Sequence, residues 1–196
     1  MISAKINQTL KKASWIRKMF EEGAMLKAEH GAENVFDFSL GNPNVPPPDA
    51  FGECLIDRAN NQRPGDHAYM PNTGYASTRE AVARFVSAEQ AVSLSAGDVI
   101  MTCGAAGALN VILKALLDPD DEVIVPAPYF VEYGFYAENH GGVLVTVPTA
   151  EDFTLDLDAI AGAVTGKTKV VLINSPNNPS GQVYSEESLR RLGELL

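Results

Sequence analysis

The sequence predicts a three-layer α/β/α protein with a mostly parallel sheet, preceded by an N-terminal helical arm. Between residues 98 and 173, short apolar runs alternate with segments of helical periodicity, which is typical of βαβ units. In addition, the runs VIV, VLVTV and VVLI are apolar along their length. Parallel strands have this composition because helices cover both faces of their sheet.

The first expected element is an amphipathic helix over residues 14–29. Ser14 can cap its N-terminus, and the apolar residues near one face are Ile16, Met19, Phe20 and Leu26. The segment GNPNVPPP, residues 41–48, is rich in proline and can form neither a helix nor a central strand. We therefore expect an arm and loop over residues 1–48 and an α/β region over residues 49–196.

Helices and strands alternate after this connector. A helix is expected over residues 76–88, with Val82, Phe85 and Val86 facing inward. The next helix shows the spacing i, i+3, i+4, i+7 at Leu109, Ile112, Leu113 and Leu116. The third expected helix is rich in aromatic residues. A fourth is expected to follow Asp156, whose side chain can cap it. The expected strands are residues 98–101, a run ending at Val125, residues 143–147 and residues 169–173.

Composition argues against several classes of function. The net charge of -10 and the pI of about 4.7 do not suit nucleic acid or an anionic membrane as a partner. No apolar run is long enough for a transmembrane helix, and the basic N-terminus lacks the apolar core of a signal peptide. The cysteines, Cys54 and Cys103, and the three histidines show no metal-ligand spacing. We therefore expect no metal and a reducing, cytoplasmic location.

A turn of small residues, Gly104-Ala105-Ala106-Gly107, joins an expected strand to an expected helix. Small residues let a phosphate approach the backbone, and the N–H groups of a helix N-terminus favour an anion. The same residues also suit close packing of a helix on a sheet, and neither a Walker nor a GxGxxG pattern is present. Phosphate binding and packing are therefore both open for this turn.

Three further candidates lie in turn-rich segments. Aromatic residues follow the strand ending at Val125, where a ring can stack on a flat ligand, although Tyr133, Phe135 and Tyr136 are expected in the core. Tyr69 precedes a turn and could donate a phenolic hydrogen bond to a ligand. Asn178, in INSPNNPSGQVY, stands at the carboxyl end of a strand, where open α/β sheets bind ligands.

Five motifs in order resemble those of the fold-type I, pyridoxal-phosphate-dependent aminotransferases of class I and II, the aspartate aminotransferase-like group. They are WIRKMFEEGAMLKAE, FSLGNPNVPPP, YMPNTGYASTREAVARF, TCGAAGALNVILKALLDPDDEVIVPAPYFVEY and INSPNNPSGQVYS. Each is loose alone, and their order makes the resemblance specific. It spans nearly the whole chain and implies the N-terminal portion of that family's large, cofactor-binding domain, with residues 1–48 belonging to the small domain.

The resemblance implies a cofactor, pyridoxal 5'-phosphate (PLP), and roles for several residues. Gly104, Ala105 and Ala106 match the turn that binds the cofactor's phosphate. Phe130 matches the aromatic residue that stacks on the pyridine ring, with Tyr129 as the alternative one residue away. Asn178 matches the asparagine that bonds the phenolic oxygen and stabilises the phenolate.

The resemblance also implies a homodimer and a substrate side of the site. Tyr69 matches the tyrosine that reaches the phosphate of the neighbouring subunit. Gly41, together with Asn178, matches positions beside the substrate. The neutral neighbours Asn42, Asn44 and Val45 do not identify the amino acid. The Ala127-Pro128 and Asn178-Pro179 bonds match positions that are often cis in the family.

The family's Schiff-base lysine has no counterpart in this sequence. The lysines present match other positions: Lys5, Lys11, Lys12, Lys18, Lys27, Lys114, Lys167 and Lys169. Nor does any residue match the aspartate that pairs with the pyridine nitrogen. Without the lysine the proton shift of transamination lacks its base. We therefore expect an N-terminal fragment with no catalytic residue of its own and no activity alone.

The expected reaction of the parent enzyme moves an amino group between an L-amino acid and a 2-oxo acid. Two alternatives stay open. Carbon–sulfur lyases and aminocyclopropane-carboxylate synthases share these motifs and the cofactor. The other alternative is a non-catalytic, half-length interaction protein. The final helical segment, ending in LGELL, argues against this alternative, because the sequence stops within it.

Overall fold

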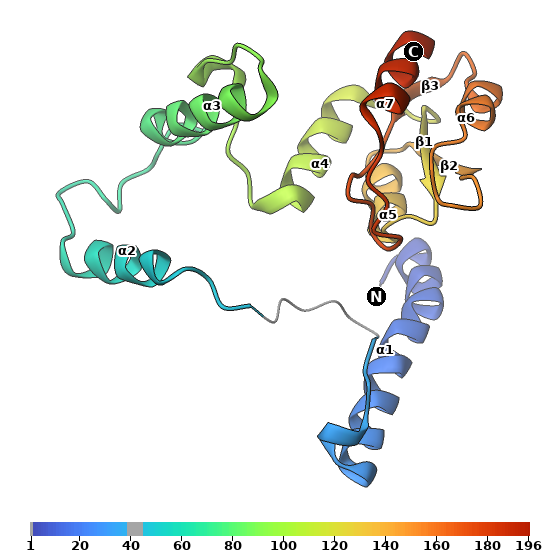
Figure 1. Ribbon diagram of the computed structural model, residues 1–196, viewed down its shortest axis with the longest axis horizontal. Helices are drawn as coiled ribbons and strands as arrows, with labels where there is room; N and C mark the ends of the chain where they lie inside the picture. The colour runs from blue at the N-terminus through green and yellow to red at the C-terminus, as the bar shows by residue number, and fades with distance from the viewer. Residues whose placement is uncertain (1, 39–44) are drawn as a thin grey trace. The chain divides into compact units, whose positions relative to one another are not determined.

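The computed structural model describes residues 2–38 and 45–196. The chain divides into two compact units, Met1–Ala68 and Tyr69–Leu196, and the ribbon in Figure 1 includes both. The domain boundary expected after residue 48 falls inside the first unit. It stays a prediction about the domains of a complete enzyme.

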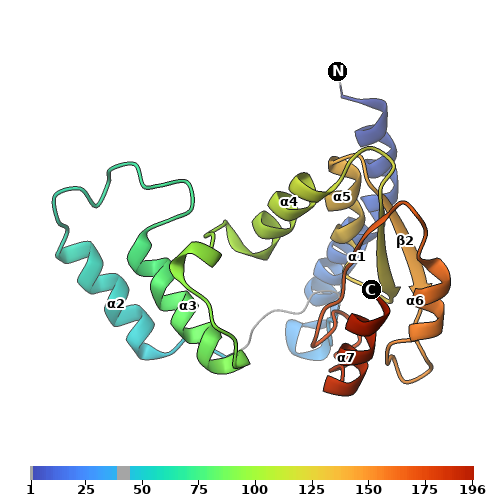
Figure 2. The ribbon, with the colours of Figure 1, turned by 90° about the horizontal axis from the view of Figure 1, so that it is seen from above.

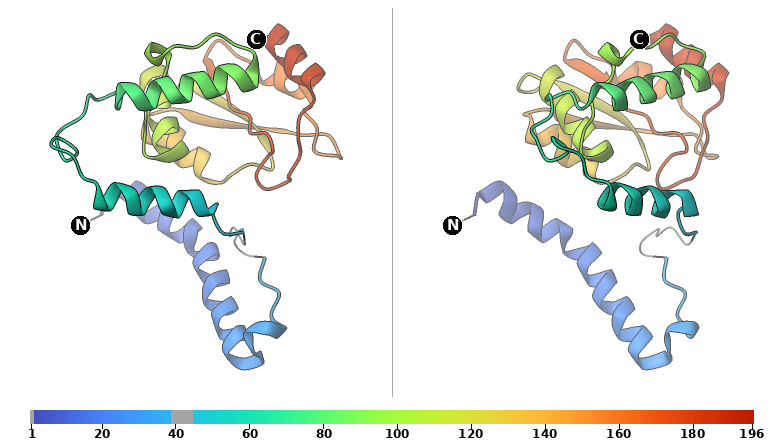
Figure 3. Two further views of the ribbon diagram at one scale, coloured as in Figure 1. Left: turned by 60° about the vertical axis from the view of Figure 1, so that its left-hand side comes forward. Right: turned by 90° about the vertical axis from the view of Figure 1, so that its left-hand side faces the viewer.

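The first unit consists of helices and connecting segments. Its first helix begins at Ala4, ten residues before the expected start, and runs without a break (blue in Figure 3). Ser3 is the cap, since its side chain accepts a hydrogen bond of 3.2 Å from the Ile6 N–H, and Ser14 lies inside the helix. The expectation for Ser14 was therefore wrong, because residues 4–13 are helix formers without Gly or Pro. The elements are α1 (Ala4–His30), η1 (Ala32–Asn34) and α2 (Asp49–Asn60).

Apolar side chains of this unit are largely uncovered within it. Met19 and Leu26, expected on one apolar face of α1, are 43% and 45% exposed, and the side chains of Ile16 and Phe20 lie outside the described ones. Every residue of α2 is exposed, including Phe51 and Leu55. No helix in the described ranges is long and apolar enough to cross a membrane.

The second unit is built on a parallel sheet in the order β2-β1-β3. β1 is the central strand, and Val123, Ile124 and Val125 in it are at most 2% exposed. The elements are α3 (Ala76–Gln90), η2 (Ala96–Asp98), α4 (Gly104–Leu116), β1 (Glu122–Ala127), α5 (Glu132–Asn139), β2 (Val143–Pro148), α6 (Leu157–Ala163), β3 (Thr168–Val171) and α7 (Glu186–Leu195).

Helices cover both faces of the sheet, which confirms the three-layer α/β/α expectation. One core cluster joins α4 and α5 to the face of β1 that carries Val123. The other joins α6 and α7 to the face that carries Ile124. Figure 2 shows α5 and α6 on opposite sides of β2. Neighbouring residues of a strand pack against different helix layers, because strand side chains alternate between the two faces of the sheet.

The strand expected at residues 98–101 is not formed. Ser95 and Asp98 make a capping box that bends the chain into η2. The Met101 N–H then donates to Thr73 O, which lies before α3 in the chain, at 3.0 Å. These hydrogen bonds hold the backbone of the segment outside the sheet, and none of its residues pairs with a described strand.

The expected inward faces of the helices are partly wrong. In α3, Val82 and Val86 are half-buried, but Phe85 is 62% exposed and Ala83 is the buried residue. Arg79 explains the difference, since it donates to the backbone oxygen of Ala96 and turns its own stripe of α3 toward η2. Phe85 lies off that stripe.

In α4 and α5, three further side chains expected in the core are exposed, and two are buried as expected. In α4, Leu113 is buried whereas Ile112 and Leu116 are about half exposed. In α5, Tyr136 is buried and Phe135 is 40% exposed.

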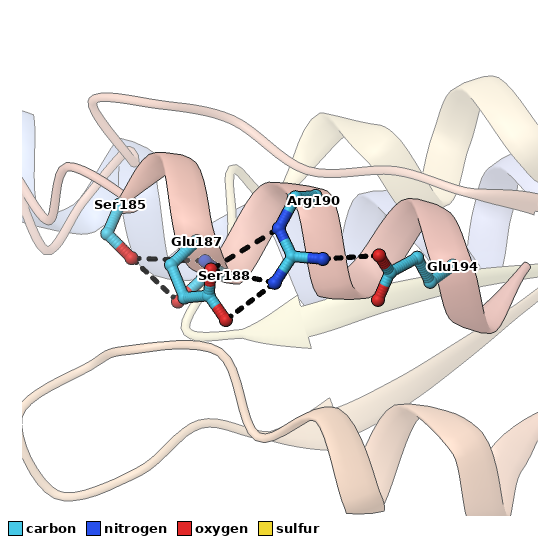
Figure 4. A network of polar contacts seen from close by, with 5 residues as sticks. All are labelled: Ser185, Glu187, Ser188, Arg190 and Glu194. Carbon is cyan, nitrogen blue, oxygen red and sulfur yellow. Dashed lines mark hydrogen bonds and ion pairs between the residues drawn. The ribbon is translucent and has the colours of Figure 1, made fainter.

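The two helices on the Ile124 face of the sheet, α6 and α7, each have a side-chain cap at the N-terminus. Asp156 caps α6 as expected, accepting from the Ala159 N–H at 2.9 Å. Ser185 caps α7 by accepting from the Ser188 N–H at 3.1 Å. Figure 4 shows this cap together with the ion pairs of Arg190 with Glu187 and Glu194. The caps satisfy backbone donors that a helix start otherwise leaves unpaired.

Candidate functional site

The carboxyl ends of β1 and β3 lie next to each other. The two strands are parallel, with Ile124 opposite Val171, and the Leu172 N–H continues the pairing to Ile124 O at 2.8 Å. The loops that follow them, residues 127–131 and 174–183, therefore leave from the same edge of the sheet. In open α/β sheets this edge is where ligands bind.

The first loop carries the two candidate stacking residues. Its Ala127-Pro128 bond is cis, as expected, and the Thr149 hydroxyl donates to Ala127 O at 3.0 Å. Phe130 is half-buried and meets the ring of Tyr133 edge-on, at a centroid distance of 5.6 Å. Tyr129 stacks on the same ring at 6.5 Å. The Tyr133 ring thus supports both candidates, and the contacts do not choose between them.

The second loop is fastened by Asn177, which the sequence interpretation did not single out. Its carboxamide Nδ2 donates to Pro128 O at 3.0 Å and to Ser180 Oγ at 2.9 Å. Asn177 is 7% exposed, whereas the neighbouring Asn178 is exposed. The sequence carries no signal for this division, because the bond that buries Asn177 joins it to a residue 49 positions earlier.

The geometry of the second loop agrees with one expectation and adds to it. The Asn178-Pro179 bond is cis, as expected, and Ser175-Pro176 is also cis. The Gly181 N–H donates to Asn177 O at 2.7 Å, and the Asn177 N–H donates to Gln182 O at 2.8 Å. The loop is therefore a closed turn with Asn178 at its outer side.

The turn at the start of α4 is open to a ligand. Gly104 has φ of +69°, a conformation that favours glycine, and a Cβ added there would meet no atom within 4 Å. Ala105 and Ala106 are exposed. Unlike α6 and α7, α4 has no side-chain cap among the described residues. Its first-turn N–H donors suit an anion, so the residues fit a phosphate group.

The direction of α4 points this turn toward the ligand edge. At the other end of the helix Leu117 lies against Gly142, beside the start of β2, so α4 runs antiparallel to the strands. Asn110 holds the helix further, since it donates to Ala106 O at 2.9 Å and contacts His140 Nε2 at 3.2 Å. The phosphate candidate and the two loops therefore belong to the carboxyl edge of one sheet.

The tyrosines around the loops are held as neutral phenols. Burial raises the pKa of Tyr184, and the nearby Tyr133 adds to the effect. Burial also raises the pKa of Tyr133. The hydrogen bond from Tyr136 to Glu132 raises the pKa of Tyr136 to about 12, with smaller effects of burial and of the Glu132 charge. These rings therefore contribute apolar surface and hydrogen-bond donors rather than charge at neutral pH.

The other candidate residues lie outside the turn and the two loops. Tyr69 is the first residue of the second unit and its side chain is fully exposed. Gly41, Asn42 and Asn44 lie outside the described residues, and Val45 is 77% exposed in the first unit. Within the ranges described, no group of His, Cys, Asp or Glu could hold a metal ion.

The lysines of the second unit lie away from the ligand edge. Lys167 and Lys169 flank the first residue of β3, at the amino end of the sheet, and Lys114 is in the C-terminal half of α4. All three are exposed. The turn and loops of this unit therefore have no neighbouring lysine from the unit itself.

Comparison with known proteins identifies the family. The family described as "Aminotransferase class I and II" matches residues 33–196. The chain belongs to the class I and II aminotransferases. Among its curated relatives, a probable aspartate/prephenate aminotransferase of Aquifex aeolicus is 38% identical over 164 residues, which are 83% of this chain and 41% of that protein. A putative aminotransferase of Bacillus subtilis is 36% identical over 94% of this chain and 46% of its own length.

Solved aminotransferases have the same fold. An amino transferase from Eubacterium rectale superimposes with a TM-score of 0.93 at 38% identity, covering all of this chain and 50% of that chain. Aspartate aminotransferase of Thermus thermophilus with maleate gives a TM-score of 0.80 at 32% identity, covering 92% and 46%. The chain thus spans about half the length of the aminotransferases it matches, and its site residues correspond to one part of such an enzyme.

Proposed function

We propose that this chain supplies the phosphate, ring and phenolic-oxygen contacts of a PLP site in an aminotransferase. The enzyme moves an amino group between an L-amino acid and a 2-oxo acid. The observation that carries the proposal is the family match over residues 33–196, which includes the open turn at Gly104 and both loops at the carboxyl edge. When bound, the cofactor acts as an electron sink for the substrate.

Each contact has a residue whose surroundings suit it. The uncapped N-terminus of α4, with Gly104, Ala105 and Ala106, holds the phosphate through backbone N–H groups. Phe130, supported by Tyr133, lies against one face of the ring. The exposed carboxamide of Asn178 donates to the phenolic oxygen and favours its ionised form.

The remaining assignments belong to the assembled enzyme. Tyr69 is fully exposed, as a residue that reaches the phosphate site of a partner subunit has to be before assembly. Gly41 is assigned to the position beside the substrate carboxylate, because it matches the family's glycine there. We propose a cytoplasmic homodimer. Because no lysine of the sequence matches the family's Schiff-base lysine, we expect no transamination by this chain alone.

Aspartate is the first amino donor to test. Relatives from Aquifex aeolicus and Geobacillus stearothermophilus are named for aspartate, with prephenate also named for the first. Those names favour an aminotransferase over the carbon–sulfur lyases and aminocyclopropane-carboxylate synthases that share the motifs. Activity would be measured after this chain is combined with the C-terminal half of one of these relatives.

The binding part of the proposal can be tested on this chain directly. PLP is added, reduced with borohydride, and the lysine-linked adducts are located by peptide mapping, while a second sample measures reversible binding by equilibrium dialysis. We expect saturable binding that inorganic phosphate competes for, with only scattered labelling of surface lysines. A single stoichiometric adduct on one lysine would contradict the assignment of the lysine to another part of the enzyme. Absence of saturable binding would contradict the proposed site.

A further inference from the structure

Asn177 is the buried polar side chain at the ligand edge that none of the family roles uses. It is 7% exposed, and burying a carboxamide is unfavourable unless its polar atoms are hydrogen-bonded. Its Nδ2 donates two hydrogen bonds, one within its own loop and one to a residue 49 positions earlier. The second of these is the one that connects two elements of the fold.

That connecting bond ends on the loop of the stacking ring. Pro128, whose carbonyl oxygen accepts from Asn177 Nδ2 at 3.0 Å, stands two residues before Phe130. Asn177 itself is joined by one peptide bond to Asn178. The hydrogen bond therefore restricts the spacing between the ring-facing residue and the residue that faces the phenolic oxygen.

The acceptor determines which side chains can do this. Pro128 O is a carbonyl oxygen and needs a donor, which Asn provides and an ionised Asp does not. Alanine would leave the oxygen without this partner. Rigid placement matters because a hydrogen-bond donor displaced from its ligand loses both binding and orientation.

We infer that Asn177 is a positioning residue. It fixes Asn178 relative to Phe130, so that the carboxamide of Asn178 reaches the phenolic oxygen of the bound cofactor. This inference rests on the proposed function. Asn177 touches neither the cofactor nor the substrate in this assignment. Asn177 affects binding only through Asn178. A residue that only stabilised the loop would show no such dependence on Asn178.

The test measures binding of pyridoxine 5'-phosphate, which carries the phosphate, the ring and the phenolic oxygen but has no aldehyde to label surface lysines. Isothermal titration on the whole chain compares the wild type with Asn177→Ala, Asn178→Ala and the double variant. We expect each single variant to bind about tenfold more weakly, the factor that corresponds to one hydrogen bond. The double variant should bind no more weakly than Asn178→Ala, because the two residues act on one contact.

Two control variants separate positioning from stability. Ser180→Ala removes the bonds that its hydroxyl accepts within the loop, from Asn177 Nδ2 and from the Gln182 N–H, and leaves the bond to Pro128 O. Its affinity should therefore stay within about twofold of wild type. Leu192→Ala removes a buried side chain on α7 and lowers thermal stability without touching either loop. Its binding, measured well below its unfolding temperature, should match the wild type.

An additive loss in the double variant, or wild-type affinity in Asn177→Ala, would overturn the inference and leave the proposed function intact. Absence of binding by the wild type would count against the proposed function instead. In that case the inference is decided by NMR of the free chain. The Asn177 carboxamide protons should exchange slowly in wild type and in Ser180→Ala, and rapid exchange in both would overturn it.

Discussion

At the scale of single residues, the account depends on which side chains face the ligand and which only support them. We propose that Phe130 and Asn178 are of the first kind, whereas Tyr133 contacts Phe130 and Asn177 bonds to Pro128 O, as supporting residues do. The motif order could indicate the first kind, because those residues match the family pattern. It could not indicate the second, because supporting contacts such as that of Asn177 with Pro128 join distant parts of the chain.

Replacing the stacking ring should weaken binding of PLP and leave the fold intact. Phe130→Ala removes an aromatic face, and we expect about a tenfold loss of affinity, within the range for one aromatic contact. Phe135→Ala is the matched control, since Phe135 is 40% exposed on α5. Equilibrium dialysis measures both. A full loss in Tyr129→Ala with no effect of Phe130→Ala would move the assignment by one residue.

The phenol of Tyr136 should lose its proton at a higher pH than an ordinary tyrosine. Its pKa is raised from 10.0 to about 12 by the hydrogen bond to Glu132. Because the folded pKa is the higher one, this contribution to stability is complete below pH 10 and is lost as the pH rises from 10 toward 12. Ultraviolet absorbance of phenolate, taken as the difference between wild type and Tyr136→Phe, measures the titration. Ionisation of this phenol near pH 10 in the folded chain would contradict the hydrogen bond.

At the scale of elements, local sequence signals succeeded where no other contact opposed them. The three strands and the α6 cap were predicted because apolar runs and an Asp at a helix start were uncontested. The strand predicted at residues 98–101 did not form, because this segment is held by the capping box of Ser95 and Asp98 and by the bond of the Met101 N–H to Thr73 O. The predicted start of α1 was wrong because Ser3 and Ser14 are equivalent as local cap signals.

The cap of α6 gives a test at this scale. Asp156→Ala removes the acceptor of the Ala159 N–H and should destabilise the second unit by about 1 kcal/mol. Asp158→Ala, one residue into the helix and exposed, is the control and should cost at most a few tenths of that amount. Urea unfolding followed by circular dichroism measures both variants. Equal effects of the two would show that charge, rather than the cap, matters here.

At the scale of the whole molecule, exposed apolar surface predicts association. Phe51, Leu55 and Ile56 on α2 are between 56% and 65% exposed, and such side chains tend to be covered by a partner. We expect dimers or larger assemblies by light scattering at micromolar concentration. The variant Leu55→Lys with Ile56→Lys should shift the population toward monomer, whereas Glu53→Lys, on the same helix, should not. A wild-type chain that stays monomeric would contradict this expectation.

We propose that one cofactor contacts the start of α4 and both loops at the carboxyl edge of the sheet. A crystal structure of the chain with PLP tests it most directly. We expect phosphate density at the turn of Gly104, Ala105 and Ala106, the ring on Phe130 and the phenolic oxygen within hydrogen-bond distance of Asn178. Density for the cofactor elsewhere, or a phosphate at the turn with the ring turned away from both loops, would contradict it.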